Sequence, residues 1–184
     1  MGKIKNFIKK LLNKDSNSEL EYLIGHGLKM GKNSTIHSGC TIDSGWPWLI
    51  EIGDNVCISS NVTILAHDYS PNIVGCGTKL GRVVIGNNVF IGTRSIVLCN
   101  VRIGNDVIVG SGSVVTHDLQ SGAVYAGSPA RRICSIEEYK EKMQGLRKNA
   151  PNFSNMRPWD TWREAPIEEK KYMVESLKDT MGFL

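Results

Sequence analysis

The stretch IGNNVFIGTRSIVLCNVRIGNDVIVGSGSVV, residues 85–115, repeats itself every six residues. An aliphatic residue opens each repeat, namely Ile85, Ile91, Val97, Ile103, Val109 and Val115. Such a period is typical of a parallel β-helix, in which each repeat is a short strand followed by a turn. Ordinary strand alternation has a period of two and would not hold one register over six consecutive units. The fold class that we expect is therefore an all-β solenoid.

The same register occurs earlier in the chain, at Met30, Ile36 and Ile42, and again at Ile52, Ile58 and Ile64. We expect the opening residue of each repeat to point inward and to stack on its equivalent one coil later. Glycine often follows it, with Asn or Asp next, as in Gly86-Asn87-Asn88. This order indicates a turn that needs either a positive φ or a close approach of two backbones.

Interruptions of the period divide the chain. We predict a helical lead-in over residues 1–28, the β-helix over residues 29–133, and a helical extension over residues 134–184. The register slips at Gly45-Trp46-Pro47-Trp48. It breaks over residues 70–82, a segment rich in glycine and turn formers that predicts an excursion loop.

The helical extension is expected to contain two helices. One follows the capping signal at Ser135, and the other follows Pro166, which suits the start of a helix. The ends of a solenoid expose strand edges that need a cap, so these helices are expected to cap the coil or to contact another subunit.

Composition narrows the function classes. The net charge of +4 arises mostly near the two ends, and no basic stripe is interleaved with aromatic residues, so nucleic-acid binding is not expected. The five cysteines are odd in number and form no C-x-x-C pair, which favours reduced thiols over a disulfide framework or zinc. Residues 1–14 form an amphipathic pattern without a secretory signal. We expect this pattern to pack against protein rather than a membrane, and the cytoplasm to be the location.

The motifs identify a resemblance. Ile85-Gly-Asn-Asn-Val-Phe-Ile-Gly-Thr and Ala126-Gly-Ser-Pro-Ala-Arg resemble the left-handed β-helix (hexapeptide-repeat) acyltransferases. The nearest likeness is to the sugar and surface-polysaccharide O-acetyltransferases and the maltose and galactoside acetyltransferases, and it covers about residues 30–133. The resemblance implies a left-handed coil and a homotrimer with active sites between adjacent subunits. It also implies acetyl-CoA as co-substrate, a sugar or glycan-precursor hydroxyl as acceptor, and no required metal.

His67 is the expected catalytic residue. It ends the run Val62-Thr-Ile-Leu-Ala-His-Asp, just before the period breaks. On position alone, a surface histidine in a loop is an equal alternative. Acyl transfer from a thioester requires the acceptor hydroxyl to lose a proton, which a neutral imidazole accepts near neutral pH. The resemblance implies a general base at this junction and direct attack on the thioester.

Four further residues are expected to bind the acceptor. Asp43 lies at the slip, where the resemblance implies acids that bind the acceptor, and Asp68 follows the base. Either Asp68 contacts the acceptor or another carboxylate orients the imidazole, for which Asp43 is the other candidate. His37 lies close to a position that helps to place the acceptor in the resembled enzymes. Trp46 offers an aromatic face for a sugar ring, with burial at a subunit contact as the alternative.

The resemblance also places the residues that contact CoA. They follow the edge of the coil and end in a guanidinium suited to phosphate: Gly92, Thr93, Ser111, Thr116, His117 and Arg131. Here His117 replaces a lysine that is frequent in the family.

Two other functions stay open on the sequence. A metalloenzyme of the γ-carbonic-anhydrase type would need several imidazoles around zinc, and no other histidine lies in the excursion loop with His67. A non-catalytic trimeric scaffold would have no use for a histidine at the break. A nucleotidyltransferase is not expected, because no nucleotide-binding domain precedes the repeats.

Overall fold

The computed structural model describes residues 18–184, so the amphipathic segment at residues 1–14 lies outside the described residues. Residues 18–25 are helical and lead into the first strand. The chain divides after Ile136 into two compact units, a repeat domain and a C-terminal unit.

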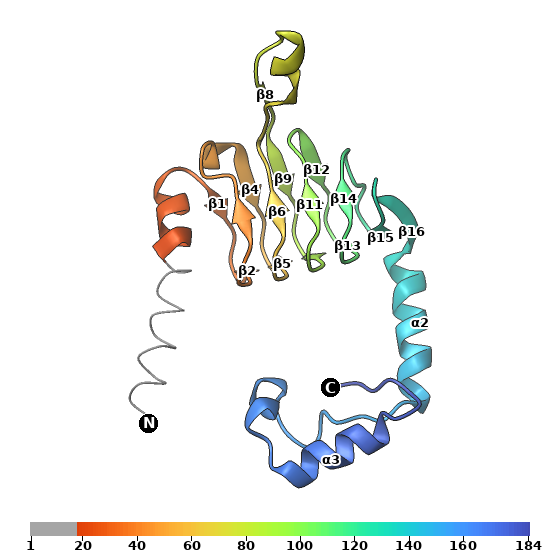
Figure 1. The fold of residues 1–184 in the computed structure, drawn as a ribbon. Coiled ribbons are helices and arrows are strands. Elements are labelled where there is room, and N and C mark those ends of the chain that lie inside the picture. Colours follow the sequence, from red (N-terminus) through yellow and green to blue (C-terminus); the bar gives the residue numbers. More distant parts are fainter. Residues whose placement is uncertain (1–17) are drawn as a thin grey trace. The chain divides into compact units, whose positions relative to one another are not determined.

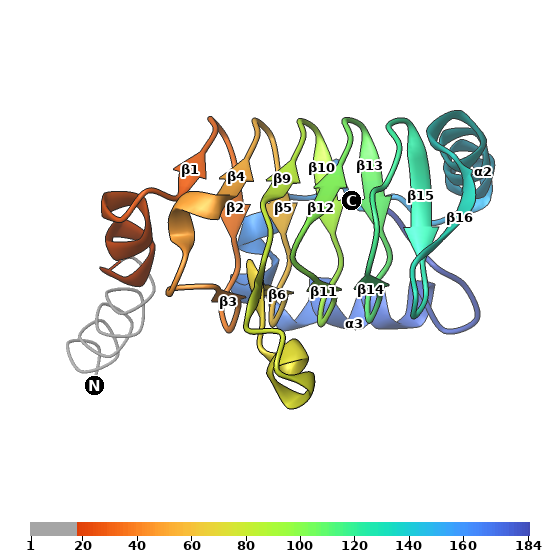
Figure 2. The same ribbon diagram turned by 90° about the horizontal axis from the view of Figure 1, so that it is seen from above.

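Three β-sheets form the repeat domain, and successive strands of the chain join each sheet in turn (Figures 1 and 2). Sheet A contains β1 (Lys29–Met30), β4 (Ile50–Ile52), β9 (Val83–Ile85) and β12 (Val101–Ile103). Sheet B contains β2 (Thr35–Ile36), β5 (Cys57–Ile58), β10 (Val89–Ile91), β13 (Val107–Val109), β15 (Ala123–Ala126) and β16 (Arg131–Ser135). Sheet C contains β3 (Thr41–Ile42), β6 (Thr63–Ile64), β11 (Ile96–Val97) and β14 (Val114–Val115). The expected parallel β-helix is therefore present.

The core is the inward stack that the period predicts. Each residue that opens a repeat between Ile85 and Val115 is at most 1% exposed. Strand register places them in columns, because Ile52 pairs with Ile85 and Ile85 with Ile103. Burying one such side chain contributes about 1.5–3 kcal/mol to the free energy of unfolding. Every coil buries equivalent side chains and so adds a similar amount of stability.

The glycines that directly follow an opening residue, such as Gly53, Gly86 and Gly104, serve close approach rather than positive φ. A Cβ added at Gly86 would lie 2.5 Å from Asn105 Oδ1 and 2.8 Å from the carbonyl carbon of Gly104. Positive φ angles fall instead on residues such as Asn55, Asn88 and Asp106. Asn and Asp tolerate this region better than other residues with a side chain.

Both interruptions leave the coil at one corner, between a strand of sheet C and the next strand of sheet A, which we call the C–A corner. The slip holds a short helical turn, η1 (Pro47–Leu49). The excursion is a projecting hairpin made of β7 (His67–Asp68), η2 (Ser70–Val74) and β8 (Lys79–Leu80). It begins at residue 67 rather than 70, because His67 already pairs with Leu80 across the hairpin.

The repeat domain ends later than the expected boundary at residue 133, because β16 turns back antiparallel along β15. The C-terminal unit contains α2 (Ile136–Asn149) and α3 (Ile167–Ser176), with η3 (Trp159–Glu164) between them. Phe153 and Ala165 are buried within this unit, and Arg157 pairs with Glu169 at 2.6 Å. None of the helices in the described part of the chain has the length and apolar character needed to cross a membrane.

Gly86→Ala should lower the free energy of unfolding by about 1–3 kcal/mol, since the new methyl group meets the backbone of the next coil. Gly145→Ala in α2 is the control, because an added Cβ there meets nothing within 4 Å. Urea denaturation followed by circular dichroism measures both variants. A Gly86→Ala protein as stable as the wild type would contradict the close-approach explanation.

Candidate active site

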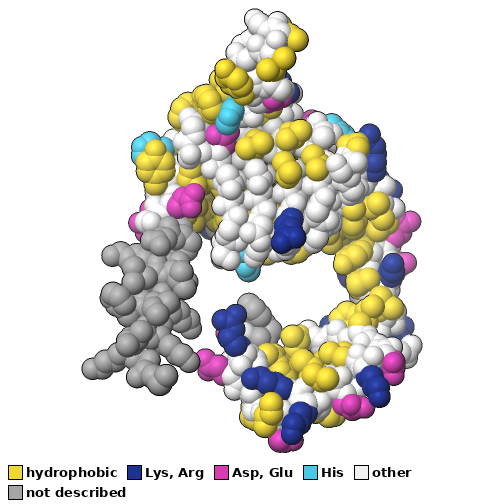
Figure 3. Space-filling model, viewed as in Figure 1, with side chains coloured by type: hydrophobic (Ala, Val, Ile, Leu, Met, Phe, Trp, Pro, Cys, Tyr) yellow, Lys and Arg dark blue, Asp and Glu magenta, His cyan; other side chains and the backbone are white. Residues whose placement is uncertain are grey.

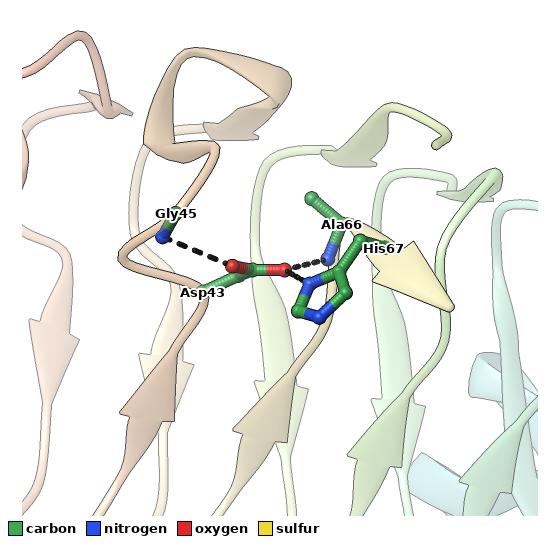
Figure 4. A network of polar contacts seen from close by, with 4 residues as sticks. All are labelled: Asp43, Gly45, Ala66 and His67. Atoms are coloured by element: carbon green, nitrogen blue, oxygen red, sulfur yellow. Dashed lines mark hydrogen bonds and ion pairs between the residues drawn. The ribbon is translucent and has the colours of Figure 1, made fainter. Parts of the chain in front are cut away.

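His67 is held by a carboxylate from the preceding coil. Its Nδ1 lies 2.5 Å from Oδ2 of Asp43 (Figure 4). The same oxygen accepts the backbone N–H of Ala66 at 2.9 Å, and Oδ1 of Asp43 accepts that of Gly45 at 3.1 Å. Strand pairing of β3 with β6 brings these residues together, although 24 positions separate Asp43 from His67.

This arrangement selects one tautomer of the imidazole. Asp43 accepts two backbone hydrogen bonds, as an ionised carboxylate does. Because a carboxylate can only accept, His67 must donate a proton from Nδ1 to bind it. The lone pair is then on Nε2, which Figure 4 shows turned away from Asp43. The His67 side chain is 34% exposed and that of Asp43 only 3%, so the imidazole is accessible and the carboxylate is not.

Trp46 packs beside the imidazole. The two ring centroids lie 4.5 Å apart, at an interplanar angle of 47°. Trp46 is half-buried and also packs against the hydrophobic core. It therefore restricts the His67 ring from one side, while Asp43 restricts it through the hydrogen bond.

A pocket of about 310 Å³ opens beside His67. Leu65, Leu98 and Cys99 line it from the C–A corner, and Asp68 and Lys79 line it from the base of the hairpin. Leu98 and Cys99 escaped the sequence reasoning, because they occupy repeat positions whose period shows only that small or apolar residues fit there.

An ion pair closes the base of the hairpin. Lys79 Nζ lies 2.9 Å from Oδ2 of Asp68, and the backbone N–H of Ser70 donates to Oδ1 at 2.9 Å. Hydrogen bonds from Ser70 and then from Lys79 lower the pKa of Asp68 from 3.8 to about 2. The hydrogen bond to Asp68 in turn raises the pKa of Lys79.

The structure gathers only part of the expected acceptor site. Asp43, Trp46 and Asp68 all lie around His67. Asp43 is buried, and both of its carboxylate oxygens already accept hydrogen bonds. Its position therefore suits orienting the His67 ring better than contacting an acceptor. His37 lies at a different corner, between β2 and β3, and lines a separate hollow with Leu20 and Cys40. Within one chain, His37 is therefore not brought to His67.

The residues expected to contact CoA fall into two groups. Thr116, His117 and Arg131 lie together, with Thr116 Oγ1 at 2.9 Å from His117 Nδ1 and Arg131 Nη1 at 3.4 Å from His117 Nε2. Gly92, Thr93 and Ser111 lie at the corner between sheets B and C, where a Cβ on Gly92 would lie 2.5 Å from the Ser111 nitrogen. The two groups thus flank sheet C.

No group of three or more His, Cys, Asp or Glu side chains is arranged to hold a metal ion within residues 18–184. All five cysteines are free thiols.

The Asp68 carboxyl should titrate near pH 2, and Lys79→Met should move this midpoint upward toward 3.8. Because the pKa is lowered in the folded protein, the contact stabilises the hairpin above about pH 4 and is lost as the pH falls through 2. Carbon-detected NMR of the side-chain carboxyl measures both midpoints. An Asp68 midpoint that is the same in wild type and Lys79→Met would contradict the ion pair.

Known proteins match this architecture. Residues 82–117 match the bacterial transferase hexapeptide family (six repeats). Protein CapG of Staphylococcus aureus is 47% identical over 105 residues, which cover 53% of this chain and 59% of CapG. The galactoside O-acetyltransferase of Escherichia coli is 33% identical over 117 residues, which cover 62% of this chain and 57% of that enzyme. The chain thus spans somewhat under two thirds of the length of these relatives.

Two solved structures are similar to this chain. A galactoside acetyltransferase in complex with coenzyme A has a TM-score of 0.57 and 31% identity, over 64% of this chain and 59% of that one. A hexapeptide-repeat acetyltransferase of Vibrio cholerae with acetyl coenzyme A has a TM-score of 0.56 and 27% identity, over 61% and 62%. Residues 82–117 thus carry the repeat of the bacterial transferase hexapeptide family, and the repeat domain is similar in sequence and fold to sugar O-acetyltransferases.

Proposed function

We propose that the chain is an acetyl-CoA-dependent O-acetyltransferase that acts on a hydroxyl group of a sugar or glycan precursor. The observation that carries the proposal is the His67 imidazole, whose Nδ1 is bound to buried Asp43 while its ring lines an open pocket. Two comparisons support the same function. One relative is a galactoside O-acetyltransferase, and two similar structures hold CoA or acetyl-CoA.

His67 acts as general base in this reaction. Nε2 takes the proton of the acceptor hydroxyl as its oxygen attacks the thioester carbon, and the imidazolium then returns that proton to the departing CoA thiolate. Asp43 stabilises the transient positive charge and keeps the ring in place. The thioester is already activated, so no acyl-enzyme is required.

The C–A corner offers a track for CoA. The backbone N–H of Leu65 donates to the carbonyl of Val97, and that of Leu98 donates to the carbonyl of Val115. The corner therefore runs, coil by coil, from the His67 pocket toward Thr116 and His117. Arg131 lies beside His117 at the far end. We infer that the thioester lies in the pocket, the pantetheine arm follows the corner, and Arg131 pairs with phosphate.

Sites between subunits of a homotrimer account for the divided CoA residues. In such an assembly, Thr116, His117 and Arg131 of one subunit would face Thr93 and Ser111 of the next. The projecting hairpin supports this assembly, because it exposes several apolar side chains among its polar ones (Figure 3). Ile73 and Val74 are 87% and 75% exposed in the single chain, which favours burial against another subunit.

The left hand of the coil and a cytoplasmic location belong to the same proposal. The handedness rests on the resemblance to hexapeptide-repeat acetyltransferases. The location rests on five free cysteines, which suit a reducing compartment.

His67→Ala should lower kcat by at least about a hundredfold, because the acceptor proton loses its base. Asp43→Asn should lower kcat by about ten- to hundredfold by leaving the ring less well oriented. A coupled CoA-release assay measures both variants, with exposed His26→Ala as the control that retains activity. Near-wild-type turnover of His67→Ala would refute the assignment of the base.

Arg131→Met should weaken CoA binding by about tenfold or more, the size expected for one charged hydrogen bond. Turnover at saturating acetyl-CoA should change little, because Arg131 lies at the opposite end of the track from His67. Isothermal titration with CoA gives the affinity, and Arg147→Met in α2 provides a matched control. Equal affinities of wild type and Arg131→Met would place the phosphates elsewhere.

A further inference from the structure

A second hollow, of about 240 Å³, opens on the outer face of sheet A. We call it the arginine hollow, and it is lined by Arg82, Val84, Asn100, Val101, Arg102 and Asp118. None of these residues belongs to the site described above.

The repeat places its side chains outward. Val84 and Arg102 are register partners on β9 and β12, and their neighbours along each strand are buried in the core. Arg82 lies where the chain returns from the hairpin, and Asn100 lies at the C–A corner with a φ of 61°. The hollow is therefore formed by strands and corners of the coil, outside the projecting hairpin.

Its lining carries more positive than negative charge. Arg82 and Arg102 oppose one carboxylate, that of Asp118, whose Oδ1 already accepts the backbone N–H of Arg102 at 2.7 Å. Arg82 pairs with Glu51 at 3.2 Å, at the rim of the hollow. In the described part of the chain the Arg102 guanidinium has no hydrogen bond or ion pair, so its donors are available to a ligand.

The arginine hollow lies next to the catalytic corner. Leu80 pairs with His67 across the hairpin, and Gly81 donates its N–H to the carbonyl of Ala66 at 3.0 Å. Arg82 follows directly. The returning chain therefore joins Leu80, the pairing partner of His67, to Arg82, the first arginine of the hollow, with one residue between them.

We propose that the arginine hollow binds the phosphate of a phosphorylated sugar acceptor, whose hydroxyl group is presented to His67. A planar guanidinium can bind two phosphate oxygens at once, and both Arg82 and Arg102 line the hollow. The inference rests on the proposed function and narrows its substrate class. A nucleoside diphosphate sugar and a hexose 1-phosphate share this chemistry.

Binding is tested first, with inorganic pyrophosphate as the probe. Isothermal titration is carried out on the full chain with CoA at saturation, so that the phosphate site of CoA is already filled. Arg102→Gln should bind pyrophosphate about tenfold more weakly or worse, and Arg102→Lys should lose less. Arg163→Gln, an exposed arginine of the C-terminal unit, is the control and should bind like the wild type.

Turnover then distinguishes the sources of phosphate. The acceptors are a nucleoside diphosphate hexose, the hexose 1-phosphate and the free hexose. Arg102→Gln should raise KM about tenfold for whichever phosphorylated acceptor is used, without a change in kcat or in KM for the free sugar.

Three results would overturn the inference: no pyrophosphate binding to the wild type, equal binding by Arg102→Gln, or a changed assembly mass in Arg102→Gln, which would assign the arginine to a subunit contact. Pyrophosphate binding that depends on Arg102, without acetyl transfer to any acceptor, would contradict the proposed function and not the anion site.

Discussion

The inward stack of aliphatic side chains is the constraint on which the rest of this molecule depends. Each coil must place an apolar side chain, in most cases Ile or Val, in the same three columns, so the strands cannot accept an inserted residue without exposing the core. Insertions are confined to the corners, and both large ones leave at the C–A corner. His67, its partner Asp43 and the projecting hairpin consequently lie together at this one corner.

That edge brings together residues that are distant in sequence. Asp43 and His67 belong to successive coils, and the pairing of β3 with β6 sets their separation before any side chain is considered. The hairpin begins at His67 itself, so the proposed base lies where the projecting hairpin leaves the coil. Burial of Asp43 and packing of Trp46 then leave the imidazole little freedom. Such preorganisation lets a single side chain act without rearrangement.

The period made much of this predictable. Columns from Ile85 to Val115 follow directly from spacing, and His67 stands out because it ends a run at the break. The contact between Asp43 and His67 could not be predicted from the period. The slip between Ile42 and Ile52 hides how many residues complete that coil, and therefore which residues lie above one another. Strand β16 was missed because Arg131 to Ser135 lacks the repeat and pairs by turning back. Arg82 and Arg102 were invisible as a pair, because only the register of β9 and β12 brings them to one hollow.

A crystal structure of the assembled protein with CoA would test the central claim most directly, that the C–A corner presents His67 to the thioester. The account predicts the CoA sulfur in the pocket formed by Leu98 and Cys99, within reach of Nε2 of His67, with Nδ1 still bound to Asp43. It also predicts a CoA phosphate at Arg131. CoA bound along another edge, or a His67 ring turned so that Nε2 faces Asp43, would contradict it.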